Sequence, residues 1–190
     1  MRQIAVLCLT LALLCVFSAC SGLHGAEDAA LSARADILAS DSVCMQLTLR
    51  ADYGDRVFDY GLTFEGDEKD AVITVTAPEN IRGFVVKIAD GKTKTEFDGV
   101  SLYMGEIAEL SETPACAAAM LVGAWKSGYI TNCKYEKMNG VDTVAVTISP
   151  DDTREVRTWF DRETNQPLYC ELMSDGKTVI YCKISDITYR

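Results

Sequence analysis

The sequence predicts a mainly β protein of the α+β class, in which a single antiparallel sheet wraps around helices. From Ser42 onward, apolar and polar residues alternate with period two in a series of short runs, as they do in strands with one buried face. Turn signals containing glycine separate these runs. Two segments with helical character, 27–39 and 114–125, precede and interrupt them. The order helix, strands, helix, strands is therefore expected within one domain.

The first helix is expected over 27–39, where Leu31, Ala35 and Leu38 recur at helical spacing. About five strands should follow it. Their expected ranges are 43–53, 56–65, 71–77, 84–88 and 93–103. The pair Asp98-Gly99 falls inside the last range, and it is interpreted as a β-bulge.

A helical insert is expected next. Thr113-Pro114 has the pattern of a helix start, with Thr as the cap and Pro at the first position. Residues 115–125 are apolar on nearly every side, so this helix has to be covered on most of its surface. It is interpreted either as a plug of the core or as one wall of a ligand-binding hollow.

The second set of strands is expected at 129–138, 141–149, 154–161, 167–173 and 178–189. Asn139-Gly140 is a strong signal for a two-residue hairpin, and it places Lys137 opposite Asp142. A turn at residues 175–176 brings Cys170 and Cys182 to neighbouring positions on adjacent strands. They are expected to form either a disulfide or a pair of buried thiols.

The N-terminus has the pattern of an export signal. A short basic start is followed by 14 apolar residues, 4–17, which are too few to span a bilayer comfortably. The run ends in Ser18-Ala19-Cys20, which resembles the lipobox of bacterial lipoproteins, and a plain secretory cut near Ala26 is the alternative. We expect a signal peptide over 1–19, a lipid on Cys20, a tether over 20–25 and a folded domain over 26–190. The protein should then lie on the outer face of the cell membrane.

Three segments carry a resemblance to a known family: 76–83 (TAPENIRG), 97–103 (FDGVSLY) and 158–168 (TWFDRETNQPL). Together with the order of elements, they resemble the LolA/LolB-like superfamily of lipoprotein carriers. That resemblance implies an incomplete antiparallel β-barrel whose open side is covered by helices. Anchored relatives include a germination lipoprotein of spore-forming bacteria, GerS, which partners a cell-wall amidase.

Composition and motifs exclude several classes of function. The net charge of -10 does not attract nucleic acid or anionic headgroups. The single histidine, His24, lies in the expected tether, which leaves no Ser-His or Cys-His set within the domain. The cysteines after Cys20 are widely spaced and lack histidine partners, so neither a metal site nor a cofactor is expected.

The family resemblance implies a non-enzymatic protein that binds an acyl chain, a lipid or a lipidated protein in an apolar hollow. The candidate lining residues are Ala118, Met120, Leu121, Trp125 and Trp159. The two tryptophans are interpreted either as walls of that hollow or simply as core. The alternative function is a protein-partner module for a cell-wall or spore-cortex enzyme, with the hollow closed by side chains. An open apolar cavity favours the first function, and a filled core with an exposed apolar patch favours the second.

Overall fold

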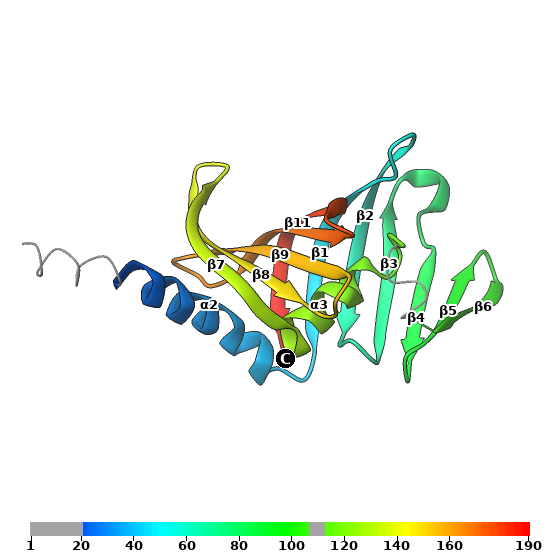
Figure 1. The fold of residues 1–190 in the computed structure, drawn as a ribbon. Coiled ribbons are helices and arrows are strands. Elements are labelled where there is room, and N and C mark those ends of the chain that lie inside the picture. Colours follow the sequence, from blue (N-terminus) through cyan, green and yellow to red (C-terminus); the bar gives the residue numbers. More distant parts are fainter. Residues whose placement is uncertain (1–20, 107–112) are drawn as a thin grey trace, which may run out of the picture.

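The computed structural model describes residues 21–106 and 113–190, and within these ranges it is mainly β. One antiparallel sheet of 11 strands has the spatial order β6-β5-β4-β3-β2-β1-β11-β10-β9-β8-β7. The sheet curves around two helices and does not close, as Figure 1 shows. The expected fold class, an incomplete antiparallel barrel with helices on its open side, is confirmed.

The elements follow the expected order closely. They are α2 (Ser21–Ala39), β1 (Val43–Asp52), β2 (Val57–Gly66), β3 (Ala71–Ala77), the short 3₁₀ helix η1 (Glu79–Ile81), β4 (Val85–Ala89), β5 (Lys92–Phe97), β6 (Val100–Glu106), α3 (Ala117–Ser127), β7 (Tyr129–Met138), β8 (Val141–Ser149), β9 (Arg154–Asp161), β10 (Pro167–Ser174) and β11 (Lys177–Tyr189).

One strand expected over 93–103 is in fact two strands. Asp98 and Gly99 have φ angles of 49° and 77°, and positive values at both central residues are typical of the tight turn of a hairpin. The turn pairs Phe97 with Val100, and β6 returns along β5. The bulge interpretation of Asp98-Gly99 was wrong, because two successive left-handed residues reverse the chain instead of adding one residue to a strand.

The helical insert starts later than its sequence suggests. Thr113 does not cap α3; residues 113–116 form a turn in which the Cys116 N–H donates to the Thr113 carbonyl over 3.1 Å. The helix proper begins at Ala117, and Cys116 at its N-cap makes no capping bond through its side chain. Pro114 therefore belongs to the turn that leads into the helix, where its missing N–H costs nothing.

The first helix is longer than expected and reaches back to Ser21, through the segment expected as a tether. No proline interrupts residues 21–39, and the helix is held at Gly25, whose carbonyl accepts a 2.5 Å hydrogen bond from the Tyr135 hydroxyl of β7. Three of its buried side chains are small, those of Ala26, Ala30 and Ala33, and the larger Ile37 and Arg34 are buried with them. Small residues allow α2 to pack closely against β7, β8 and α3.

The hairpin at Asn139-Gly140 is confirmed. Both residues have positive φ angles, 50° and 86°, and Lys137 lies directly opposite Asp142. Their side chains form an ion pair of 3.0 Å.

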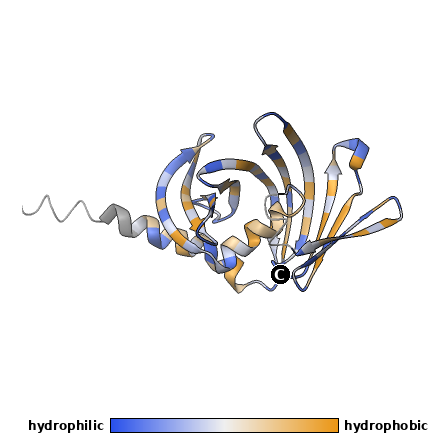
Figure 2. Cartoon of the chain, turned by 45° about the vertical axis from the view of Figure 1, so that its right-hand side comes forward, coloured by the Kyte–Doolittle hydropathy of each residue, from blue (hydrophilic) through white to orange (hydrophobic). Residues whose placement is uncertain are grey.

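The core lies between the concave, inner face of the sheet and the two helices. Its largest fully buried side chains include Trp125 of α3, Phe64 of β2 and Phe160 of β9. Hydrophobic segments run along α3 and along the strands around it, as Figure 2 shows. Figure 1 shows that α2 lies at the β7 end of the sheet, whereas the β5–β6 hairpin stands at the opposite end.

Candidate functional site

Three of the five candidate lining residues lie inside a filled core. Ala118, Leu121 and Trp125 are all 0% exposed. They pack against the inner face of the sheet together with side chains from both halves of the chain. A ligand cannot touch them unless α3 or the sheet moves, so this helix acts as a plug. Their role in ligand binding stays a prediction.

Trp125 is fixed in this position by polar contacts as well as by packing. Its indole Nε1 donates a 2.8 Å hydrogen bond to Oγ1 of Thr158 on β9, and its ring lies 6.4 Å from that of Phe160. The side chain of Arg34 on α2 donates through Nε to the Trp125 carbonyl over 2.7 Å. A buried indole N–H needs a partner such as Thr158, and this hydrogen bond holds α3 on β9. The hydrogen bond from Arg34 holds α3 on α2.

Met120 is half-buried and lies at the edge of the plug. The hollow beside it, lined also by Val156 and Leu172, measures only about 10 Å³, which is the space of about one water molecule. Drug-sized ligands occupy sites of roughly 300 Å³ or more. The space next to Met120 is therefore too small for an acyl chain.

Trp159 lies on the opposite face of the sheet and does not join the other four. Its neighbours Thr158 and Phe160 point into the core, so the period-two alternation of β9 turns Trp159 outward. It is nevertheless only 3% exposed, because side chains from β7 cover it. Trp125 and Trp159 therefore lie on opposite sides of the sheet, and they do not form the expected wall together.

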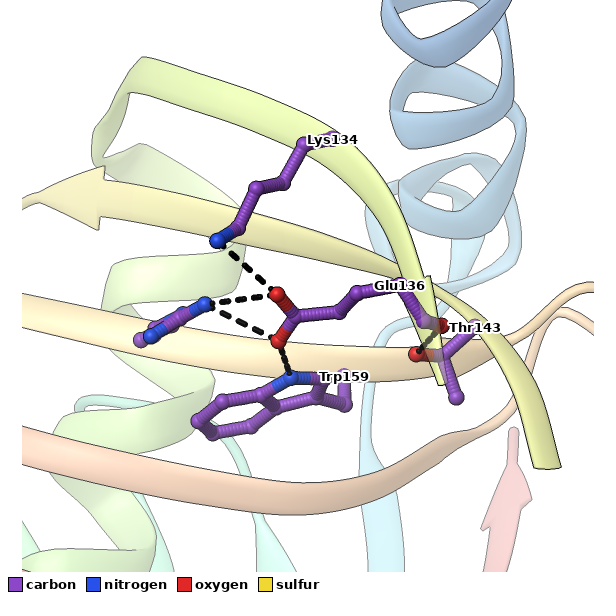
Figure 3. A network of polar contacts seen from close by, with 5 residues as sticks. Lys134, Glu136, Thr143 and Trp159 are labelled. Carbon is purple, nitrogen blue, oxygen red and sulfur yellow. Dashed lines mark hydrogen bonds and ion pairs between the residues drawn. The ribbon is translucent and has the colours of Figure 1, made fainter. Parts of the chain in front are cut away.

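The cover over Trp159 is a polar network centred on Glu136, which Figure 3 shows. The Glu136 carboxylate accepts hydrogen bonds from the Trp159 indole and from Arg157, the latter at 2.9 and 3.1 Å. It also forms a 2.9 Å ion pair with Lys134, and the Arg157 guanidinium lies 4.5 Å from the centre of the Trp159 ring. Burial opposes ionisation of Glu136, but these donors and cations outweigh it and lower its pKa. All four groups are paired, which indicates a structural role.

Cys170 and Cys182 occupy directly opposed positions of β10 and β11. The expectation that they are close neighbours is confirmed, and both are free thiols. Burial raises the pKa of Cys170 to about 12 and that of Cys182 well above its ordinary value. They act here as small apolar core residues.

An exposed apolar surface occurs where sequence reasoning did not place one. We call β4, β5 and β6 the β4–β6 arm. On its inner face lie Phe84, Phe97, Val100 and Leu102: the register pairs Phe97 with Val100 and Thr95 with Leu102, and the rings of Phe84 and Phe97 are 5.9 Å apart. Phe97 is 39% exposed, Leu102 61% and Val100 70%. The signal was present in the sequence, because a hairpin turn at 98–99 aligns residues 97, 100 and 102 on one face.

The outer face of the same arm is charged. Lys87 and Lys94 form ion pairs with Glu96 at 2.6 and 3.3 Å. A hairpin with one charged and one apolar face normally buries the apolar face. On the inner face burial decreases across the arm, from Val86 at 0% exposed on β4 to Leu102 on β6. Helix α3 packs on β8 and β10. The arm therefore presents its apolar side chains beyond the part of the sheet that α3 covers.

A second hollow of about 440 Å³ lies on the outer face of the sheet, over β1, β2, β10 and β11. Tyr169 and Tyr181 line it, and the ion pair of Arg50 with Asp59, at 3.0 Å, stands at the same place. Most of its walls come from outward positions of the strands, although the core residues Leu49 and Cys182 also line it. Elsewhere, no group of three His, Cys, Asp or Glu residues within the described ranges is arranged to hold a metal ion.

Comparison with known proteins gives the architecture a context. The structure is similar to that of a LolA superfamily protein from Nitrosomonas europaea, with a TM-score of 0.51 and 15% sequence identity, over 85% of this chain and 93% of that one. It is also similar to a putative outer membrane lipoprotein-sorting protein domain from Vibrio parahaemolyticus, with a TM-score of 0.53 and 10% identity, over 88% and 93% of the two chains. The chain has a LolA-like fold.

At such low identity the LolA-like similarity concerns the fold alone. No protein-family model matches the sequence, and no curated protein matches it either. The expected relation to GerS stays a prediction. Cys20 and the expected signal peptide lie outside the described residues. Among the residues that are described, no helix is long and apolar enough to cross a membrane.

Proposed function

We propose that this chain is a non-enzymatic binding protein of the cell envelope, anchored through a lipid on Cys20. Its ligand is an acyl chain of a lipid or of a lipidated protein, which lies against the inner face of the β4–β6 arm. The proposal combines the lipobox-like Ser18-Ala19-Cys20 with the LolA-like fold, and it moves the ligand from the space under α3 to the arm.

One observation carries the proposal: Phe97, Val100 and Leu102 expose a continuous apolar face next to the core. Removing apolar surface from water is worth about 25 cal/mol per Å². The charged outer face of the arm stays in water, which supports binding of an apolar ligand on the inner face. An acyl chain laid along this face would extend the core outward from Val86.

Uptake of a fluorescent fatty acid tests the proposal. Leu102→Lys puts a charge on the inner face and should weaken binding by about tenfold or more. Tyr103→Lys is the matched control, because Tyr103 is 60% exposed on the outer face of the same strand, and it should leave binding within about twofold. Equal effects of the two variants, or a wild-type protein that takes up no probe, would contradict the proposal.

A protein-partner module is the second candidate function. The observation in its favour is the filled interior: Ala118, Leu121 and Trp125 leave no hollow under α3. A flat exposed apolar patch suits a protein surface as well as it suits a lipid. A wild-type protein that never binds the fatty acid at all would favour this function.

A further inference from the structure

The strand at the end of the arm has an unpaired backbone edge. β6 pairs with β5 on one side, and in the part of the chain that the structure describes no strand lies on its other side. Half of the N–H and C=O groups of a strand point to each side, so among the described residues the outer edge of β6 offers a row of donors and acceptors that no strand pairs. The chemical group that complements such a row is another extended polypeptide backbone.

β6 also lacks the features that keep edge strands from pairing. Edge strands are normally protected by charged side chains, by proline or by a covering helix. From Val100 to Gly105 there is neither a charge nor a proline. The opposite edge of the sheet is protected by charges and by a helix. β7 carries Lys134, Glu136 and Lys137, and α2 packs against it.

The charges at the two ends of β6 indicate what kind of strand would fit. Asp98 precedes the uncharged stretch and Glu106 closes it, and both are exposed. The inner positions Val100 and Leu102 are apolar, and the outer positions Ser101 and Tyr103 carry hydroxyl groups. The complementary strand therefore alternates apolar and polar residues and has a basic residue at each end.

We propose that β6 is a docking strand for an extended polypeptide segment of a partner protein, one with alternating apolar residues flanked by Lys or Arg. The segment adds to the sheet beyond β6, and its apolar side chains continue the inner face beside Val100 and Leu102. This inference rests on the proposed function in one respect: the peptide and the acyl chain of a lipidated partner would occupy adjoining parts of the same arm.

A short synthetic peptide tests backbone pairing directly. The probe is fluorescently labelled acetyl-Lys-Val-Thr-Val-Thr-Val-Lys-amide, and the full chain is titrated with it while anisotropy is recorded. A peptide of the same composition without alternation, Lys-Val-Val-Val-Thr-Thr-Lys, is the control and should bind about tenfold more weakly or worse. Replacing both probe lysines by glutamate should also weaken binding, because Asp98 and Glu106 then face like charges.

Methylation of peptide amides separates strand addition from simple apolar contact. Two versions of the probe carry N-methyl groups on alternate residues, either the odd or the even ones. Alternate amides of a strand point to opposite sides, so one version should lose binding by about tenfold or more and the other should keep it. Equal binding of the two versions overturns strand addition.

The other outcomes are also decisive. If the peptide fails to bind at millimolar concentration while the fatty acid binds and responds to Leu102→Lys, the docking strand is wrong and the proposed function stands. If the peptide binds and the fatty acid does not, the docking strand stands and the proposed function is wrong. The chain could also self-associate through β6. If Leu102→Lys abolishes self-association and the peptide does not compete with it, the partner of β6 is a second copy of the chain, and the proposal is overturned.

Discussion

Thr158 decides how the largest side chain of the core is oriented. Its hydroxyl accepts the hydrogen bond of the Trp125 indole over 2.8 Å, and Thr158 itself is fully buried on β9. Because water cannot reach the indole N–H, the loss of this acceptor leaves a donor unpaired in the core. The contact joins α3 to β9 of the sheet.

Thr158→Val should lower the free energy of unfolding by about 1–3 kcal/mol, the usual cost of a buried donor without a partner. Urea denaturation followed by tryptophan fluorescence measures it. The same substitution at Thr63, a partly exposed strand residue of β2, should change stability by about 0.5 kcal/mol or less. Indistinguishable losses at the two positions would show that the indole hydrogen bond is unimportant.

Asp151 should make stability depend on pH in the acid range. A side-chain hydrogen bond from Arg154, with further hydrogen bonds from Thr153, lowers its pKa to about 2 although some burial opposes this. The folded state therefore favours the ionised form. The stabilisation is complete above the ordinary carboxyl pKa near 4 and is lost as pH falls towards 2.

Asp151→Asn should cost about 1 kcal/mol at pH 7, a figure reduced for solvent screening of this partly exposed group. The cost should shrink towards zero as the pH approaches 2. Stability curves of both proteins across pH 2 to 7 measure the difference, and a cost that does not vary with pH would contradict the assignment.

At the scale of elements, α3 and β6 are both apolar segments, but they differ in what surrounds them. Leu121 of α3 is 0% exposed within the core, and Leu102 of β6 is 61% exposed at the edge of the sheet. The structure therefore assigns the first to stability and makes the second available for binding.

Leu121→Ala should cost about 2–5 kcal/mol, the range for a buried leucine that leaves a cavity. Leu102→Ala should cost well under about 1 kcal/mol, because its side chain is mostly in water already. Chemical denaturation of the two variants provides the comparison. A large loss at Leu102 would mean that the arm is part of the core in solution.

The turn residues made the order of the strands predictable from the sequence. The face of the sheet on which each side chain lies, and whether a helix covers it, was not predictable in the same way. Asn139-Gly140 fixes both a hairpin and its register, so the Lys137–Asp142 pair followed from the sequence alone. Asp98-Gly99 has the same turn chemistry, but it falls inside the strand-like run 93–103, and that position favours the bulge interpretation. The position of Trp159 depends on which face of β9 meets the core, and a single strand does not reveal that. The exposed apolar face of the arm was not predicted, because the sequence of a strand does not show whether a helix packs on it in the folded protein.

At the scale of the whole molecule, the chain combines an acidic surface with an apolar arm. A net charge of -10 gives no electrostatic attraction to anionic headgroups, so attachment to a membrane would have to come from the proposed lipid on Cys20 or from an apolar surface. α2 is described from Ser21, so the proposed anchor residue directly precedes the described part of the chain.

Cys20→Ala should release the protein from the membrane or stall its maturation. A lipoprotein N-terminus carrying several acyl chains holds firmly, whereas a single chain binds only marginally. Membrane fractionation of cells expressing the variant, with detergent phase partition of the wild type alongside, measures this. Normal maturation together with unchanged membrane retention would exclude the anchor.

Native mass spectrometry of the protein purified gently from membranes is the most direct test of whether the β4–β6 arm holds an acyl chain. We expect a bound species with the mass of a lipid or a lipidated peptide on the wild type and on Tyr103→Lys, and we expect Leu102→Lys to lose it. A wild-type protein that carries no such species, or a lipid retained equally by Leu102→Lys, would contradict it.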